Sequence, residues 1–237
     1  MTQAMTLATS ASAALPWRAE LRLEFAPRGG RTRLITQRHR GPLLVQRPFH
    51  PEATDVCHAY LLHPPAGIGG GDQLSLTVHA LAGAQVLLTT PSATRFYRSA
   101  SLVSSLSQEL FVAAGASLEW LPQENLWFEG ARAEIGTHVH QSGDARFCGW
   151  EILCLGHAAC ATLIASGASQ TDLEAARAVI APVERGMASA TLLDDVLVCR
   201  LLAAHVSPLR ALCERLWAAL RPRLLARDGH APRIWAT

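Results

Sequence analysis

The sequence predicts a mainly β protein of stacked strand pairs, with one or two α-helices near the C-terminus. Short segments of the first two-thirds alternate apolar and polar residues, which is typical of strands buried on one face. A unit of strand, Ala-Gly-Ala, strand and proline occurs twice, with its glycines at Gly83 and Gly115. The last third instead carries apolar residues at helical spacing. The repeated unit suggests strand pairs whose faces bury against each other.

Composition excludes several classes of protein. Of the 237 residues, 49% are apolar and 17% are charged, which is enough to bury a core and too few charges for a disordered chain. A net charge of +2 does not provide the dense basic surface of a nucleic-acid binder. No run reaches the roughly 18 apolar residues needed to span a bilayer. We therefore expect neither nucleic acid nor a membrane as a partner.

One domain, residues 17–237, is expected after a disordered tail at residues 1–16. The tail is rich in Ala, Ser and Thr and lacks the basic and apolar regions of a signal peptide. The six cysteines are dispersed and form no CxxC pair. A chain with a full core does not need disulfides, so we expect reduced thiols and a cytoplasmic protein.

Strands are expected along the first two-thirds of the chain, in pairs separated by turns. Arg28-Gly29-Gly30 makes the first turn, and Gln141 to Asp144 makes a later one. In order, the expected strands are Ala19 to Phe25, Arg31 to Gln37, Leu43 to Gln46, Val56 to Leu62, Leu74 to Leu81, Gln85 to Thr90, Leu102 to Val112, Ser117 to Leu121, Ala133 to His140 and Ala145 to Leu153. An early group of arginines fits an exposed strand face and loop better than a phosphate-binding patch. The group is Arg28, Arg31, Arg33, Arg38, Arg40 and Arg47.

The last third predicts two helices with two short strands between them. Thr171 to Ile180 forms the first helix, with Thr171 or Asp172 as its N-cap. Asp194-Asp195 makes a turn between two strands within Ala190 to Leu202. Ser207 to Leu220 forms the second helix, with Ser207 as N-cap and Pro208 as the first helical residue.

The strongest local motif is a glycine-rich run after the double proline Pro64-Pro65. Its glycines permit positive φ and close backbone approach. They are Gly67, Gly69, Gly70 and Gly71. A phosphate loop is disfavoured because no Gly-Lys-Ser/Thr follows and the segment leads into a strand, so a structural loop is the favoured interpretation. Asp72 closes the run, either as a turn cap or as an oxygen ligand for a divalent ion.

Two further segments mix polar and aromatic residues. Thr89 to Arg98 fits a strand end followed by an exposed loop, and a polar loop on a rigid β scaffold is a common place for recognition. Trp120 and Trp127 are expected in the core. Glu119 alternates with its apolar neighbours and is expected to point away from the core, and Glu124 is expected in a loop.

Two residue groups suggest metal binding, and each has a simpler explanation. His138 and His140 share one face of a strand, where an exposed surface is favoured over a weak metal site. Cys154, His157 and Cys160 lie close together but match no standard zinc spacing. No nucleophile elbow, zincin motif or kinase motif is present. From the residues alone, a stand-alone metal-binding protein and an uncharacterised β-rich enzyme both stay open.

Four blocks of the sequence carry a family resemblance. They are His63 to Asp72, Leu87 to Ser99, Gly115 to Glu124 and Pro232 to Thr237. In this order they resemble the pattern of the urease accessory protein D family. The resemblance implies a β-helix-like fold and no catalysis by the chain itself. It also implies a complex with urease accessory proteins F and G, the latter a GTPase, which docks on apo-urease. No cofactor is then tightly bound, and Ni²⁺ passes transiently through an internal passage to the urease site.

The resemblance also suggests roles for individual residues. Asp72, Glu119 and Glu124 are expected at the nickel passage or at an interface. Partner contact is expected for a second set, His63, Arg95, Tyr97 and Arg98. Ala66 and Arg95 replace a glycine and a lysine of the family pattern. Family members also carry a further stretch of strands near the position of Cys160, some tens of residues long, which this chain lacks.

Overall fold

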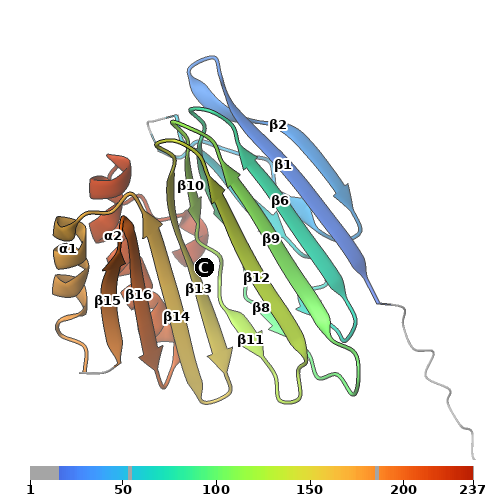
Figure 1. Ribbon diagram of the computed structural model, residues 1–237. Coiled ribbons are helices and arrows are strands. Elements are labelled where there is room, and N and C mark those ends of the chain that lie inside the picture. The colour runs from blue at the N-terminus through green and yellow to red at the C-terminus, as the bar shows by residue number, and fades with distance from the viewer. Residues whose placement is uncertain (1–15, 53–54, 185–186, 237) are drawn as a thin grey trace, which may run out of the picture.

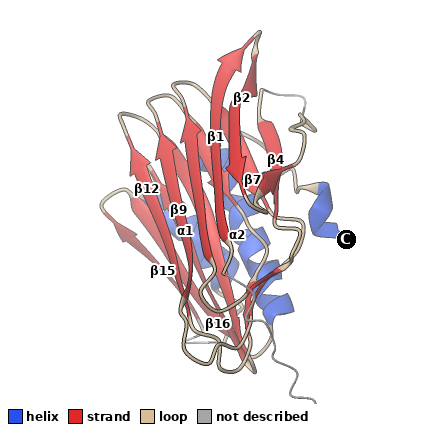
Figure 2. Cartoon of the chain, turned by 90° about the vertical axis from the view of Figure 1, so that its right-hand side faces the viewer, coloured by secondary structure: helices blue, strands red, loops and turns tan. Residues whose placement is uncertain are grey.

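Two β-sheets and a layer of helices make up the molecule. The computed structural model describes residues 16–52, 55–184 and 187–236, so nearly all of the expected tail lies outside the described residues. Seen from the side, the smaller sheet, the larger sheet and the helices follow one another as three layers (Figure 2). No helix in the described ranges is both long and apolar enough to cross a membrane.

The smaller sheet has five strands in the order β12-β9-β6-β1-β2 (Figure 1). Its strands are β1 (Arg18–Arg28), β2 (Arg31–Arg40), β6 (Gln73–Ala80), β9 (Ser104–Val112) and β12 (Ala133–Gln141). The β1–β2 pair is the expected antiparallel hairpin, while β1, β6, β9 and β12 run parallel. Most residues of β2 are exposed, so the early arginines lie on a solvated face as expected.

The larger sheet runs in the order β15-β16-β14-β13-β10-β7-β4-β3, with three short strands beside this path. Its strands are β3 (Leu44–Val45), β4 (Cys57–Leu62), β7 (Gln85–Thr89), β10 (Ser117–Trp120), β13 (Arg146–Leu155), β14 (Ala158–Ser166), β15 (Ala188–Leu193) and β16 (Val196–Ala203). The short strands are β5 (Gly67–Ile68), β8 (Thr94–Phe96) and β11 (Asn125–Trp127). Strands β5, β8, β11 and β14 were not predicted from the sequence.

The chain winds through both sheets as a coil, which confirms the stacked strand pairs and the β-helix-like scaffold. Each full turn places one long strand in the smaller sheet, one strand in the larger sheet and one short strand before the next turn. Gln85 lies beside Ser117 in the β7–β10 pair, so successive turns are offset by the 32-residue spacing of the repeated unit. Gly83 and Gly115 have φ values of +73° and +70° and stack on each other, because the coil bends sharply at the same place in each turn.

Two helices cover the outer face of the larger sheet, and a short 3-10 helix, η1 (Arg233–Ala236), ends the described chain. Helix α1 (Gln170–Ile180) begins after Ser169, not at the expected Thr171 or Asp172, because Ser169 and Asp172 form a capping box. Helix α2 (Val206–Leu225) begins after His205, two residues before the expected start. Pro208 is tolerated there because backbone N–H groups of a first turn have no helical partner.

Apolar side chains fill both spaces between the three layers. The space between the sheets contains Phe25, Phe96 and Leu110, and that between the larger sheet and the helices contains Trp150, Leu216 and Trp217. The expected core residue Trp120 is 6% exposed, and Trp127 packs at the edge of the inner cluster. All six cysteines lie in the described part and are free thiols, as expected.

Candidate functional site

Three of the four sequence blocks meet at one end of the space between the sheets, and the fourth packs on the outer face of the larger sheet. Strand β5 of the glycine-rich run pairs with β8, and β8 pairs with β11 directly after the third block. The C-terminal block contacts the second block from the outer face of the larger sheet, where Trp235 Nε1 donates to Thr89 Oγ1 over 3.3 Å. The Trp235 ring also packs against Trp150 and Trp217, with centroid distances of 5.2 and 5.3 Å. Residues far apart in the sequence thus build one structural site.

A cavity of about 80 Å³ lies beneath this junction. Apolar side chains from both sheets form much of its wall, and the polar residues that also line it are His63, Thr90, Ser92, Thr94, Gln108 and Asn125. The buried atoms His63 Nδ1 and Gln108 Oε1 have no hydrogen-bond partner within the described ranges. A polar cavity of this size has room for water molecules, which would satisfy both atoms.

The neutral form of the His63 side chain is suited to binding a cation. Burial lowers the pKa of His63, and the nearby Asp72 carboxylate opposes this only in part. A neutral imidazole leaves one ring nitrogen free to accept a proton or to ligate a metal. His63 lines the cavity, and its predicted role in partner contact stays a prediction.

Asp72 organises the glycine-rich loop. Its Oδ1 accepts a hydrogen bond from Trp17 N–H and its Oδ2 accepts one from Gly69 N–H, both over 2.7 Å. The structural interpretation of the loop also fits its glycines, because a Cβ on Gly67 would collide with the Tyr97 ring and one on Gly70 with Ser99. Both carboxylate oxygens of Asp72 are thus already used by the backbone.

Glu119 lies where the sequence did not predict it. The expectation that it points away from the core is wrong, since its side chain is fully buried. Strand β10 is covered on both faces, by the smaller sheet and by α2, so alternation does not bring every second residue to solvent. Glu119 accepts hydrogen bonds from Trp217 Nε1 over 2.7 Å and from Arg221 Nε over 3.0 Å.

Glu124 lies apart from Asp72 and Glu119. Its carboxylate forms an ion pair with Arg210 Nη1 over 2.6 Å. The three predicted acidic residues therefore do not converge on one point, and each is held by donors of the protein itself. Their role at a passage or an interface stays a prediction.

An exposed aromatic pair marks the outer surface of the junction. Tyr97 is 46% exposed and stacks on Phe128 with ring centroids 5.5 Å apart. Arg98 is exposed beside Gly130, and Arg95 is partly buried in β8. Exposed Tyr and Arg side chains are common anchors of protein interfaces, so the surface suits the predicted contact role.

Neither suggested metal cluster gains support. His138 and His140 share a face, as expected, and lie 3.5 and 2.8 Å from the Glu109 carboxylate. Cys154 lies opposite Ala159 in the β13–β14 pair, which puts Cys154 and Cys160 on opposite faces of the sheet. No group of three His, Cys, Asp or Glu residues with metal-binding geometry occurs in the part of the chain that the structure describes.

Sequence reasoning missed Gln108 and Arg221. Gln108 interrupts an apolar face of β9 between Leu106 and Leu110, and that polar residue in an inward series was a usable signal. Arg221 continues the buried stripe of α2 four residues after Trp217. A charged residue at an apolar position of a helix indicates a buried partner, but the sequence does not say which one.

The fold and the site define a parallel β-coil scaffold with helices on one side and a partly polar cavity between its sheets. Comparison with known proteins then gives the family. The model of the UreD urease accessory protein family matches residues 18–160 and, in a second match, residues 156–236. The chain therefore belongs to the UreD family of urease accessory proteins.

Curated relatives of the chain carry the name of the same family. The chain is 39% identical to a urease accessory protein UreD of Pseudomonas putida, over 93% of this chain and 95% of the relative. It is 36% identical to a urease accessory protein UreD 2 of Brucella anthropi, over 93% and 98%. These alignments extend over 264 and 270 positions, more than the 237 residues of this chain. The relatives thus contain residues without a counterpart here, and the two family matches meet at residues 156–160.

Proposed function

We propose that this chain is a urease maturation factor and acts as a scaffold in nickel insertion. With accessory proteins F and G it forms a complex that docks on apo-urease and assists GTP-dependent insertion of Ni²⁺ into the metallocentre. The chain itself catalyses no reaction, holds Ni²⁺ only in passing and works in the cytoplasm. Family membership supports the link to urease, and one structural observation, the partly polar cavity between the sheets, supports the passage of an ion.

The chemistry of the cavity suits transient binding. Imidazole nitrogen is a good ligand for Ni²⁺, and an amide oxygen is a weaker one. His63 Nδ1 and Gln108 Oε1 have no partner within the described ranges, so a hydrated ion can exchange water molecules for them without breaking a hydrogen bond of the protein. Two neutral ligands bind more weakly than a closed Cys/His site, which allows release to the next carrier.

The surface around Tyr97 is the second part of the proposal. Tyr97, Arg95 and Arg98 contact a protein of the complex, with Phe128 extending the aromatic surface. Asp72 and Gly67 act indirectly, since they fix the loop against which Tyr97 lies.

Gln108→Met tests the passage. Methionine keeps the length of the side chain and removes the amide oxygen, so we expect nickel loading of apo-urease to fall about tenfold, the lower end of losses at metal-site neighbours. Loading is measured by elemental analysis of urease after incubation with the accessory proteins, GTP and Ni²⁺.

Leu76→Met is the matched control, because Leu76 lines the same cavity without a polar atom. It should leave loading unchanged, and both variants should still form the complex. Wild-type loading by Gln108→Met would contradict a passage through this cavity, and equal urease activation without the chain would contradict the function as a whole.

A further inference from the structure

Strand β12 leaves one side of its backbone open. It forms an edge of the smaller sheet and, among the described strands, pairs only with β9. Ser142 N–H donates to Val112 O at the end of this parallel pair, so the even-numbered residues of β12 bond to β9. The N–H and C=O groups of Ile135, Thr137 and Val139 therefore point away from β9, toward the open side.

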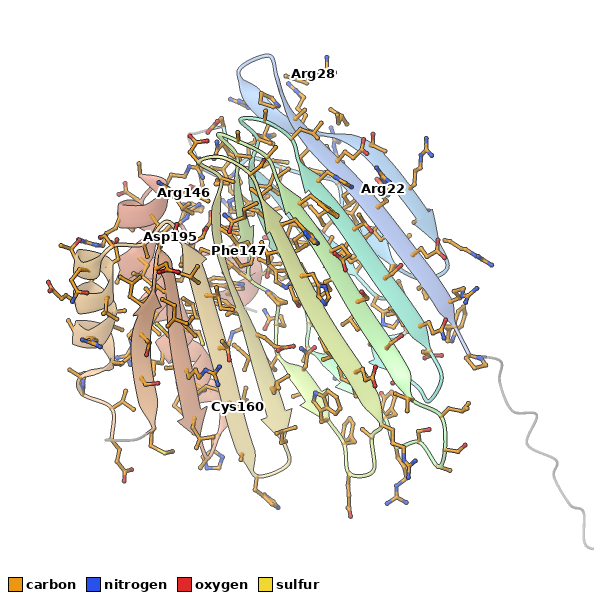
Figure 3. All side chains as sticks on the ribbon, viewed as in Figure 1. Arg22, Arg28, Arg146, Phe147, Cys160 and Asp195 are labelled. Atoms are coloured by element: carbon orange, nitrogen blue, oxygen red, sulfur yellow. The ribbon has the colours of Figure 1, made fainter. Side chains whose placement is uncertain are left out.

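A groove runs beneath this edge. The larger sheet continues past β12 through β14, β16 and β15, which no strand of the smaller sheet covers (Figure 1). Thr137 and Val139 of β12 face Glu151, Thr162 and Ile164 of β13 and β14 across a groove of about 230 Å³. Figure 3 labels Phe147 of β13 and Cys160 of β14, the two strands of the larger sheet that line the groove.

Among the residues that the structure describes, Glu151 is the only acidic one that lines this groove. It is partly buried and makes no hydrogen bond or ion pair with any residue that the structure describes. Burial raises the pKa of Glu151, since the carboxylate loses water without gaining a partner. Thr162 of β14 lies between Glu151 of β13 and Arg200 of β16. The backbones of Glu151 and Arg200 are therefore two strand spacings, or about 10 Å, apart. The groove thus offers an uncompensated negative charge.

Comparison with the relatives bears on what lies near the groove. The relatives contain additional residues, and the family matches meet at 156–160, the tip of the β13–β14 hairpin beside the groove. In this chain that tip is the short turn Gly156-His157.

We propose that the β12 edge and this groove form a docking site for an extended segment of another protein of the urease maturation complex. The segment adds a strand to β12 through the three open backbone positions. Its apolar side chains enter the groove, and a Lys or Arg side chain meets Glu151. This inference rests on the proposed function, since it takes its partner from that complex.

Hydrogen exchange at single amides tests the docking in the assembled complex. On binding of apo-urease and accessory proteins F and G, exchange at Ile135, Thr137 and Val139 should slow by about tenfold or more. The amides of His138 and His140 already bond to β9 and should change little. If the complex forms and activates urease while the three edge amides stay unprotected, the docking site is wrong and the proposed function stands. If no complex forms, both fail.

Two pairs of variants locate the contact. Thr137→Pro removes an open N–H and Glu151→Lys reverses the groove charge, and each should weaken assembly about tenfold. Thr137→Val keeps the N–H, and Glu134→Lys changes an exposed residue on the other face of β12, so both should bind like the wild type.

Thermal melting of each variant checks that it is folded. If Thr137→Pro is unfolded, the binding of Glu151→Lys alone tests the docking site. Wild-type assembly by the folded variants, or a dimer of the isolated chain that Thr137→Pro dissociates, would overturn the proposal.

Discussion

At the scale of single residues, Arg221 is a charged side chain that needs buried partners, because it has no access to water. Its guanidinium is fully buried in α2 and contacts two carboxylates, Glu52 Oε1 over 2.6 Å and Glu119 Oε2 over 3.0 Å. Its Cζ lies 5.1 Å from the centre of the Trp217 ring. A buried cation of this kind is stable only while both carboxylates remain in place, and the two buried carboxylates likewise depend on the cation.

Arg221→Ala should therefore be strongly destabilising. Removing the cation leaves Glu52 and Glu119 buried with like charges, which costs about 3–5 kcal/mol in comparable buried pairs. Urea unfolding of the purified chain measures the change.

Arg223→Ala is the control on the same helix. Arg223 pairs with Asp172 over 2.6 Å, but its side chain is 40% exposed, so the loss should stay below about 1 kcal/mol. Similar losses for the two variants would show that burial does not set the strength of the Arg221 pairs.

At the scale of elements, the stacked turns set the spacing of the coil. Gly83 N–H donates to Ala114 O over 3.2 Å, and Gly115 N–H donates to Asp144 Oδ1 over 2.7 Å, so each turn is bonded to the next. Both glycines have positive φ. The turns repeat because the same backbone bend must join the two sheets in every coil.

Gly115→Ala should destabilise the chain by about 1–2 kcal/mol, because an L residue is strained at φ +70°. The strain is conformational, since a Cβ there would meet only the Gly83 backbone at 3.7 Å. Gly136→Ala is the control: this strand glycine has no positive φ, and its change should be near zero or slightly stabilising. Thermal or urea unfolding compares them, and equal losses would contradict the conformational explanation.

At the scale of the whole molecule, one polar network ties the layers together. Glu52 comes from the segment before β4, Glu119 from β10 and Arg221 from α2, and His58 Nε2 of β4 lies 2.7 Å from Glu52 Oε1. Burial alone would raise the pKa of Glu52, but hydrogen bonds from His58 and Arg221 and the charge of Arg221 hold it at about 2. The network therefore makes stability depend on pH.

Acid should weaken the fold through Glu52. Its pKa is lower in the folded chain than the ordinary value of 4.5, so its contribution is complete above about pH 4.5 and is lost as pH falls toward 2. Between pH 6 and pH 3 the free energy of unfolding should fall about 2 kcal/mol more in the wild type than in Glu52→Gln. Urea unfolding at both pH values measures this.

Glu20→Gln is the control for the acid experiment. The Glu20 side chain is 56% exposed and lies 3.9 Å from Arg40, so the variant should keep the pH dependence of the wild type. If Glu52→Gln also keeps that dependence, Glu52 is not the group through which acid acts.

The sequence by itself determined the class of fold. Alternation marked most long strands, the Ala-Gly-Ala turns marked the coil, and helical spacing marked α1 and α2, because each of these signals lies within a few neighbouring residues. Strand β14 was missed since its Ala-rich sequence alternates little, and β5, β8 and β11 are too short to show a period. The family blocks were likewise visible in the sequence.

Only the tertiary structure decided what the polar residues do. Stacking of the coils brought His63 and Gln108 to one cavity, turned Asp72 into a loop anchor and buried Glu119 beneath Arg221. It also left β12 open beside Glu151. A local pattern says which residues form a strand, but the neighbours of that strand are fixed by contacts far apart in the sequence, and those neighbours determine whether a charged group meets water, an ion or a partner.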